Sequence, residues 1–203
     1  MTTTERSYFD HNATAPIRPE AAEALLSALN HTGNASAPHG EGRAARARLE
    51  DARKHVADLV GADSAGVVFT SSGTEADVLA LTPDIARGGE PLACDVLITT
   101  PVEHSAVLRG HRFAADRVEL IPVDARGRIR LDALDAVLAG HQEAGRRPLV
   151  SIMVANNETG VIQPVAEAAR RARARGALIH SDAVQAAGRI AVDIGTLAAD
   201  MLL

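Results

Sequence analysis

The chain has 203 residues, of which 46% are hydrophobic and 23% are charged, and its formal net charge is −5. This length and composition provide enough apolar material for a buried core, which excludes a wholly disordered chain. The acidic balance and the lack of a basic stripe in the sequence exclude an electrostatic surface for nucleic acid. We therefore predict a globular protein with no nucleic-acid partner.

Targeting signals are missing from the sequence. Its apolar runs are too short to cross a bilayer, and residues 1–7 lack the apolar core of a signal peptide. Cys94 is the only cysteine, so no internal disulfide can form, and we expect it to be a buried small residue rather than a reactive thiol. These features predict a cytoplasmic protein that does not associate with membranes.

Two helices are predicted in the first third of the chain. The first covers residues 19–30, with a proline in its opening turn, and the second runs from about Glu41 to Val60 and ends at Gly61. Between them, residues 33–40 are rich in turn-forming side chains and predict a loop. The second helix has apolar residues spaced to share one face, namely Ala45, Leu49, Ala52, Val56 and Leu59.

Beyond Gly61, short apolar runs alternate with helical patterns, which favours an α/β fold with a mostly parallel sheet. Strands are predicted at residues 67–70, 95–100, 118–121, 149–154 and 177–181. Helices are expected to begin between them, near Thr74, His104, Asp132 and Pro164. The run 200–203 resembles the start of another buried strand, so we expect the sequence to be part of a longer domain.

The segment Ser71-Ser72-Gly73-Thr74-Glu75 follows the first predicted strand and opens a helix. A helix N-terminus offers unpaired N–H groups and the positive end of the helix dipole, which together suit a phosphate group. Gly73 allows close approach of the backbone, and Thr74 adds a hydroxyl. The alternative is an ordinary Ser/Thr helix cap.

Asp182 and Gln185 follow the last complete predicted strand, at the sheet edge where α/β proteins bind ligands. A carboxylate there can keep a pyridine nitrogen protonated, and Gln185 can reach the phenolic oxygen of the same ring. The alternative is a helix-capping aspartate and a surface glutamine. His104 and Asn157 also follow strands, where they can contact an aromatic ligand or serve only as loop residues.

Lys54 is the only lysine in the chain, and we predict that it is exposed on the second helix. An enzyme that binds an aldehyde cofactor through an amine therefore needs a lysine beyond Leu203, since a guanidinium does not form that bond. We predict no metal site, because no metal-ligand spacing joins the cysteine to His39, His111 and His180.

Six stretches occur together and in order, at residues 8–16, 33–43, 69–75, 103–107, 156–160 and 180–185. In these the chain resembles the cysteine desulfurase family, which are pyridoxal-phosphate enzymes of fold-type I within the class V aminotransferase group. The resemblance implies a three-layer α/β/α fold with a mostly parallel sheet, the large domain of such an enzyme, ending before its Schiff-base lysine. Residues 1–15 would be an N-terminal arm, and residues 16–203 the incomplete pyridoxal-phosphate-binding domain.

The resemblance also implies roles by position. Gly73 and Thr74 match the phosphate-binding pair, and His104 matches the histidine that stacks on the pyridine ring and assists proton transfer. The family's Schiff-base lysine and sulfur-accepting cysteine have no counterpart in these 203 residues.

The remaining cofactor contacts implied by the resemblance follow the later strands. Asn157 and Gln185 match residues near the ring oxygen, and Asp182 matches the partner of the pyridine nitrogen. The chain departs from the family pattern at Val78, Val184 and Pro83.

The implied activity is conversion of L-cysteine to L-alanine, with the sulfur passed to an enzyme cysteine as a persulfide. A homodimer, a sulfur-acceptor protein and iron–sulfur cluster assembly are implied partners and context. The alternatives are a non-catalytic subunit or scaffold, or a related enzyme such as a selenocysteine lyase, a kynureninase-like hydrolase or an epimerase. A nucleotide-binding domain shares the α/β pattern, but the sequence lacks its glycine-rich fingerprint.

Overall fold

The computed structural model describes residues 7–203, so most of the segment examined for a signal peptide lies outside the described residues. The chain divides into two compact units, Met1–His55 and Val56–Leu203. The predicted arm at residues 1–15 and large domain at residues 16–203 stay predictions. Within the described range, no helix combines the length and the apolar character needed to cross a membrane.

The first unit contains α1 (Pro19–Leu29) and most of α2 (Gly40–Val60), as predicted. Pro19 opens α1, where its missing N–H group is not needed by the helix. The loop between the helices packs closely on α2: a Cβ atom at Gly42 would collide with the carbonyl oxygen of Ala37. The apolar face predicted for α2 is largely exposed, with Leu49, Val56 and Leu59 between 38% and 57% accessible.

The second unit is built on a five-stranded sheet with the order β4-β3-β5-β6-β7, and all neighbouring strands are parallel. Its strands are β3 (Val96–Thr99), β4 (Val118–Leu120), β5 (Pro148–Ser151), β6 (Leu178–Ser181) and β7 (Met201–Leu202). The small antiparallel hairpin is β1 (Ala86–Arg87) and β2 (Glu90–Pro91).

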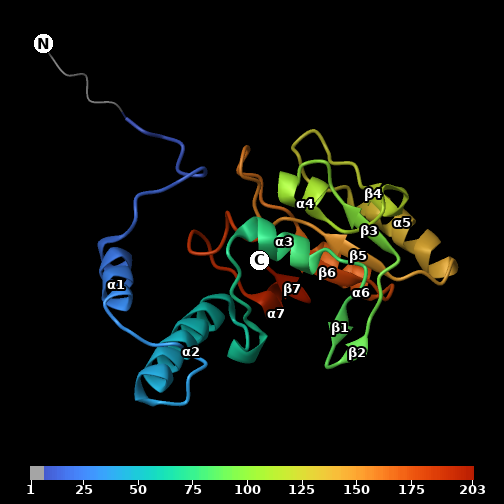
Figure 1. Cartoon of the computed structure of the whole chain (residues 1–203). Coiled ribbons are helices and arrows are strands. Elements are labelled where there is room, and N and C mark those ends of the chain that lie inside the picture. Colours follow the sequence, from blue (N-terminus) through green and yellow to red (C-terminus); the bar gives the residue numbers. More distant parts are fainter. Residues whose placement is uncertain (1–6) are drawn as a thin grey trace, which may run out of the picture. The chain divides into compact units, whose positions relative to one another are not determined.

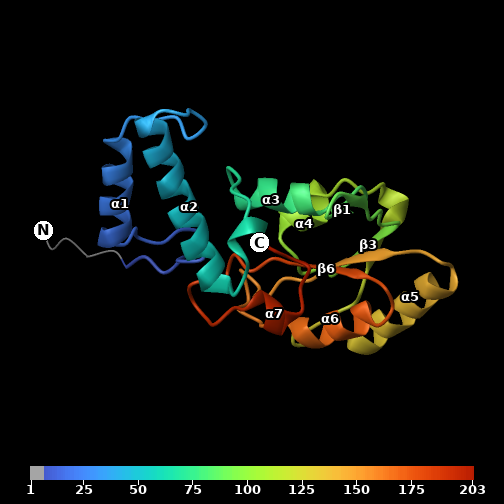
Figure 2. The same cartoon turned by 90° about the horizontal axis from the view of Figure 1, so that it is seen from below.

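Helices cover both faces of this sheet, which confirms the predicted three-layer α/β/α architecture (Figures 1 and 2). Figure 2 shows α3 and α4 on one side and α5, α6 and α7 on the other. Their bounds are α3 (Gly73–Ala80), α4 (Ser105–Gly110), α5 (Leu131–Glu143), α6 (Val165–Arg173) and α7 (Ile194–Leu197), with 3₁₀ turns at Ser64–Gly66 and Ala115–Arg117.

Two apolar clusters lie on opposite faces of the sheet because successive strand residues alternate in direction. The larger cluster joins Val96, Val150 and Ile179 to α5 and α6. The smaller cluster contains Leu97, Leu149 and Leu178 with side chains from the α3 and α4 side. Cys94 is buried in the smaller cluster, as predicted. The strands are thus apolar on both faces.

The prediction of a strand at residues 67–70 is wrong. These residues have no strand assignment in the structure, and Val68 and Phe69 are exposed. An apolar run becomes a strand only when another strand pairs with it, and the pattern of one segment cannot supply that partner. The other four predicted strands and the one starting at residue 200 are confirmed, whereas the β1–β2 hairpin and the four-residue α7 were not predicted.

Gly61 is expected to be a sensitive position in the second unit. Its φ angle is +65°, and a Cβ atom there would collide with the Asp193 carboxylate that caps α7. Gly145 provides a matched control, because its φ angle is +66° but nothing lies within 4 Å of the same position. Gly145→Ala is expected to lower the free energy of unfolding by about 1 kcal/mol, and Gly61→Ala by about 2–4 kcal/mol. Urea unfolding tests this, and equal losses would contradict the role of Asp193.

Candidate functional site

The predicted site residues follow the carboxyl ends of three parallel strands, together with the N-terminus of one helix. His104 follows β3, Asn157 follows β5, and Asp182 follows β6. Gly73 begins α3, and a Cβ atom on it would lie 3.6 Å from Val184 Cγ2, so this helix end abuts the segment after β6. The carboxyl ends of parallel strands share one sheet edge, where α/β proteins bind ligands.

The N-terminus of α3 is capped by its own side chains, and two of its backbone N–H groups have no acceptor among the described residues. Ser72 Oγ accepts a hydrogen bond from Glu75 N (3.2 Å), and a Glu75 carboxylate oxygen accepts from Ser71 N (2.6 Å). The backbone hydrogen bonds of the described residues do not engage the N–H groups of Gly73 or Thr74. The cap and the phosphate interpretation are therefore compatible, since they use different N–H groups.

Asp182 is 7% exposed, and its Oδ1 accepts a hydrogen bond from Val184 N (2.9 Å). Burial has the largest effect and raises the pKa of Asp182. The hydrogen bond from the Val184 N–H group lowers this pKa, and the charge of His104 lowers it by a smaller amount. Among the described residues, no lysine or arginine pairs with this carboxylate. A buried carboxylate without a cation is costly, so this position suits a cationic group of a ligand.

His104 is held at the N-cap of α4, where its Nδ1 accepts a hydrogen bond from Ala106 N (3.2 Å). The neutral ring therefore carries its proton on Nε2. The preceding residue, Glu103, is buried and anchors this loop to β3 and to the end of β5: Thr100 Oγ1 donates to Glu103 Oε1 (2.8 Å), and Met153 N donates to Oε2 (2.9 Å). The His104 loop is thus fixed by a side chain that sequence reasoning did not identify.

The loop after β5 is organised by Asn156 rather than by the predicted site residue Asn157. Asn156 Oδ1 accepts hydrogen bonds from Glu158 N (3.0 Å) and from Thr159 N (2.8 Å), and Nδ2 donates to the carbonyl oxygen of Val102 (2.8 Å). The last bond joins this loop to the His104 loop. Asn157 is half-buried, and its amide donates to Glu158 Oε1 (2.8 Å).

Asn156→Ala is expected to lower the free energy of unfolding by about 1–3 kcal/mol, because it leaves the Val102 carbonyl and the Glu158 and Thr159 N–H groups, all in part-buried hydrogen bonds, without their partner. Asn157→Ala, at the neighbouring half-buried position, should cost less than about 1 kcal/mol. Urea unfolding of both variants provides the comparison. A loss at Asn157 as large as that at Asn156 would contradict this account of the loop.

Three buried acids gather at these strand ends: Asp77 of α3, Glu103 and Asp182. Burial, and then the charge of Asp182, raises the pKa of Asp77 to about 7. At Glu103, burial raises the pKa by more than the hydrogen bonds from Thr100 and Met153 lower it, and the pKa is about 8. Sequence reasoning missed Asp77, although an aspartate inside the apolar run Ala76–Ala80 is a signal that it is buried.

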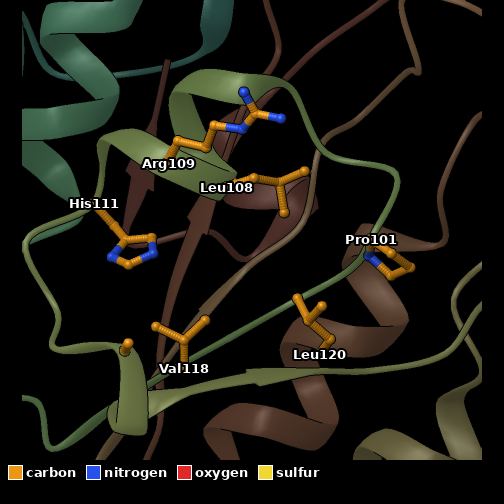
Figure 3. A pocket seen from close by; sticks show the side chains of 7 residues that line it. Pro101, Leu108, Arg109, His111, Val118 and Leu120 are labelled. Atoms are coloured by element: carbon orange, nitrogen blue, oxygen red, sulfur yellow. The ribbon is translucent and has the colours of Figure 1, made fainter.

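Gln185 lies in the turn after Asp182 and is half-buried. A cavity of about 550 Å³ lies elsewhere in this unit, between α4 and β4. Figure 3 shows Leu108, Arg109 and His111 on one side of it and Val118 and Leu120 on the other. It is lined by none of the six predicted site residues, so its volume says nothing about their role.

Comparisons with known proteins agree with this architecture. The aminotransferase class-V family matches residues 7–203. A cysteine desulfurase of Cereibacter sphaeroides is 42% identical over 204 residues, which cover 98% of this chain and 51% of that relative. A solved NifS-like protein superposes with a TM-score of 0.83 at 34% identity, over 97% of this chain and 53% of the other.

A further structure, described as SspA in complex with cysteine, gives a TM-score of 0.81 at 26% identity, over 97% of this chain and 56% of that one. The chain spans about half the length of the curated relatives that it matches. The match along nearly its whole length shows that the chain belongs to the class-V aminotransferase family.

Proposed function

We propose that the protein, as its complete polypeptide, is a pyridoxal-phosphate-dependent cysteine desulfurase. The observation that carries this proposal is Asp182, a buried carboxylate without a cationic partner among the described residues, which follows β6 near the N-terminus of α3. Relatives about 40% identical are named cysteine desulfurases, which supports the reaction class. The family depends on pyridoxal 5′-phosphate.

The residues of this chain fit that cofactor in their chemistry. The free N–H groups of Gly73 and Thr74 would bind its phosphate, and Asp182 would bind its pyridine nitrogen. Asn157 and Gln185 would contact the ring oxygen. When bound, the cofactor supplies an electron sink for bond breaking next to the substrate's amino group.

His104 would stack on the ring and move a proton. Its Nδ1 is occupied by the Ala106 N–H group, so proton exchange falls to Nε2. Glu103 would hold this imidazole in place through its bonds to Met153 and Thr100. A catalytic lysine and a sulfur-accepting cysteine would come from sequence outside these 203 residues, since Lys54 is on α2 and Cys94 is buried in the apolar core.

The proposed substrate is L-cysteine, and the proposed products are L-alanine and enzyme-bound sulfur. SspA, a structural neighbour solved in complex with cysteine, supports a cysteine substrate for this fold. A homodimer, a sulfur-acceptor protein for iron–sulfur cluster assembly and a cytoplasmic location belong to the same proposal.

The test is to supply the complete polypeptide encoded by the gene with pyridoxal 5′-phosphate, L-cysteine and a thiol reductant, and to quantify alanine and sulfide. Equal amounts of both products are expected. Cofactor binding with turnover of L-selenocysteine alone would indicate a selenocysteine lyase. Failure to bind the cofactor would favour a non-catalytic scaffold.

A further inference from the structure

Asp77 of α3 and His180 of β6, which is two residues before Asp182 in the chain, face each other between the helix and the sheet. Asp77 Oδ1 lies 3.5 Å from His180 Nε2, and these side chains are 2% and 1% exposed. Neither atom has a hydrogen-bond partner among the described residues, and their 3.5 Å separation is longer than an ordinary hydrogen bond. On the other side of the ring, His180 Nδ1 lies 2.9 Å from Ser151 Oγ. The ring is thus positioned between an acid and a hydroxyl.

An ion pair is a poor description of this contact. A buried ion pair needs further hydrogen bonds to compensate for the lost hydration of both charges, and Asp77 Oδ1 receives no donor from the described residues. One shared proton would satisfy both atoms without a buried charge once the side chains approach by a few tenths of an ångström: a protonated Asp77 can donate to Nε2 while Nδ1–H donates to Ser151 Oγ.

We propose that Asp77 and His180 form an electrically neutral, proton-sharing pair, which makes Asp77 a positioning residue for Asp182. His180 and Asp182 are two residues apart, so both belong to the sheet face that α3 covers. With Asp77 neutral, Asp182 faces one fewer negative charge. Asp182 can then remain ionised and bind a cationic group of the ligand. The consequence for Asp182 rests on the proposed function, whereas the neutral pair does not.

Charged groups around the pair are consistent with a proton on Asp77. Asp182 follows β6, and Glu103 follows β3; both interact electrostatically with Asp77. His104, the cap of α4, acts on Asp182, and Arg109 of α4 lines the cavity of Figure 3. The pKa of Asp77 is raised to about 7, and burial lowers the pKa of His180 to about 4.

These two directions give opposite dependences of stability on pH. Between about pH 4 and 7, a folded state that keeps the Asp77 proton binds more protons than the unfolded chain, so this group's contribution to stability falls as pH rises. Between about pH 4 and 6.5, the unfolded chain protonates His180 and the folded state does not, so its contribution increases. In the wild type the two trends nearly cancel, because one proton is bound in each state.

The experiment separates the trends with Asp77→Asn and His180→Gln, and uses the exposed Asp84→Asn as a control. Urea unfolding is measured from pH 4 to 8. Relative to wild type, Asp77→Asn should become more stable with rising pH, by up to about tenfold per pH unit in the unfolding equilibrium constant. His180→Gln should show the opposite trend, and Asp84→Asn none.

A flat difference for Asp77→Asn would mean that the pair holds no proton, which overturns the proposal. An ion pair holds the same single proton as the neutral pair and gives the same trend, so ¹⁵N NMR of the His180 ring at pH 6 separates the two: one protonated and one unprotonated ring nitrogen are expected, and two protonated nitrogens would overturn the proposal. If His180→Gln does not fold, the trend for Asp77→Asn and the ring spectrum of His180 in the wild type still decide. Normal cofactor binding by an Asp182→Ala variant would refute the proposed function. The opposite trends would nevertheless remain, so the two failures are distinguishable.

Discussion

Asp182→Ala is expected to weaken binding of pyridoxal 5′-phosphate to the complete polypeptide by about 30- to 4000-fold. The carboxylate is buried and has no lysine or arginine partner among the described residues, so a cationic ring nitrogen would be its main counter-charge. Removing one partner of a buried charge pair typically costs about 2–5 kcal/mol, because the other charge is left unpaired. Equilibrium dialysis at neutral pH measures the affinity directly.

Two further variants isolate the charge from the shape. Asp182→Asn keeps the size of the side chain and an oxygen for the Val184 N–H group, so a similar loss of affinity would assign the effect to charge. The exposed Asp84→Asn changes net charge equally and should leave the affinity unchanged. An Asp182→Ala protein that folds and binds the cofactor as tightly as wild type would refute the assignment of this residue.

Glu103→Ala is expected to lower the free energy of unfolding by about 3–5 kcal/mol. The substitution leaves Met153 N and Thr100 Oγ1 without their partner in a buried position and opens a cavity. Glu103→Gln should be much milder, because an amide has the same shape and can both accept from Met153 N and donate to Thr100. Urea unfolding at pH 6 provides the measurement.

The pH dependence of Glu103→Gln has a definite sign. Burial raises the pKa of Glu103 to about 8, so the folded state holds a proton that the unfolded chain releases near pH 4.5. The contribution of Glu103 to stability therefore falls as pH rises from about 4.5 to 8, and the glutamine variant gains stability relative to wild type over that window. The exposed Glu90→Gln should show no such gain. A gain confined to pH below 4.5 would contradict the buried protonated state.

Local patterns predicted most of the fold because helices and buried parallel strands have strong signals of their own. The apolar run at Val96–Thr99 and the alanine-rich α6 carry such signals. The run at residues 67–70 carries the same signal, but strand formation also depends on a pairing neighbour. The four-residue α7 depends on the Asp193 cap and on packing rather than on periodicity.

The site divides in the same way. Residues just after strand ends, such as His104 and Asp182, could be predicted because parallel strands end at one edge. The buried partners behind them could not, because their function depends on contacts between distant segments. Glu103 meets Met153 fifty residues later, and Asp77 of α3 meets His180 of β6 where the helix packs on the sheet. Asn156 and Asn157 are adjacent and chemically identical. Only the structure shows that Asn156 anchors the loop, whereas Asn157 is left as the residue that could contact a ligand.

The central claim is that pyridoxal 5′-phosphate binds at these strand ends. Its most direct test is a titration of the ¹⁵N-labelled complete polypeptide with the cofactor, followed by NMR of the backbone amides. The largest shifts are predicted at Gly73 and Thr74 and in the segment 182–185. Shifts limited to residues around the cavity between α4 and β4, with Gly73 and Asp182 unaffected, would contradict the account.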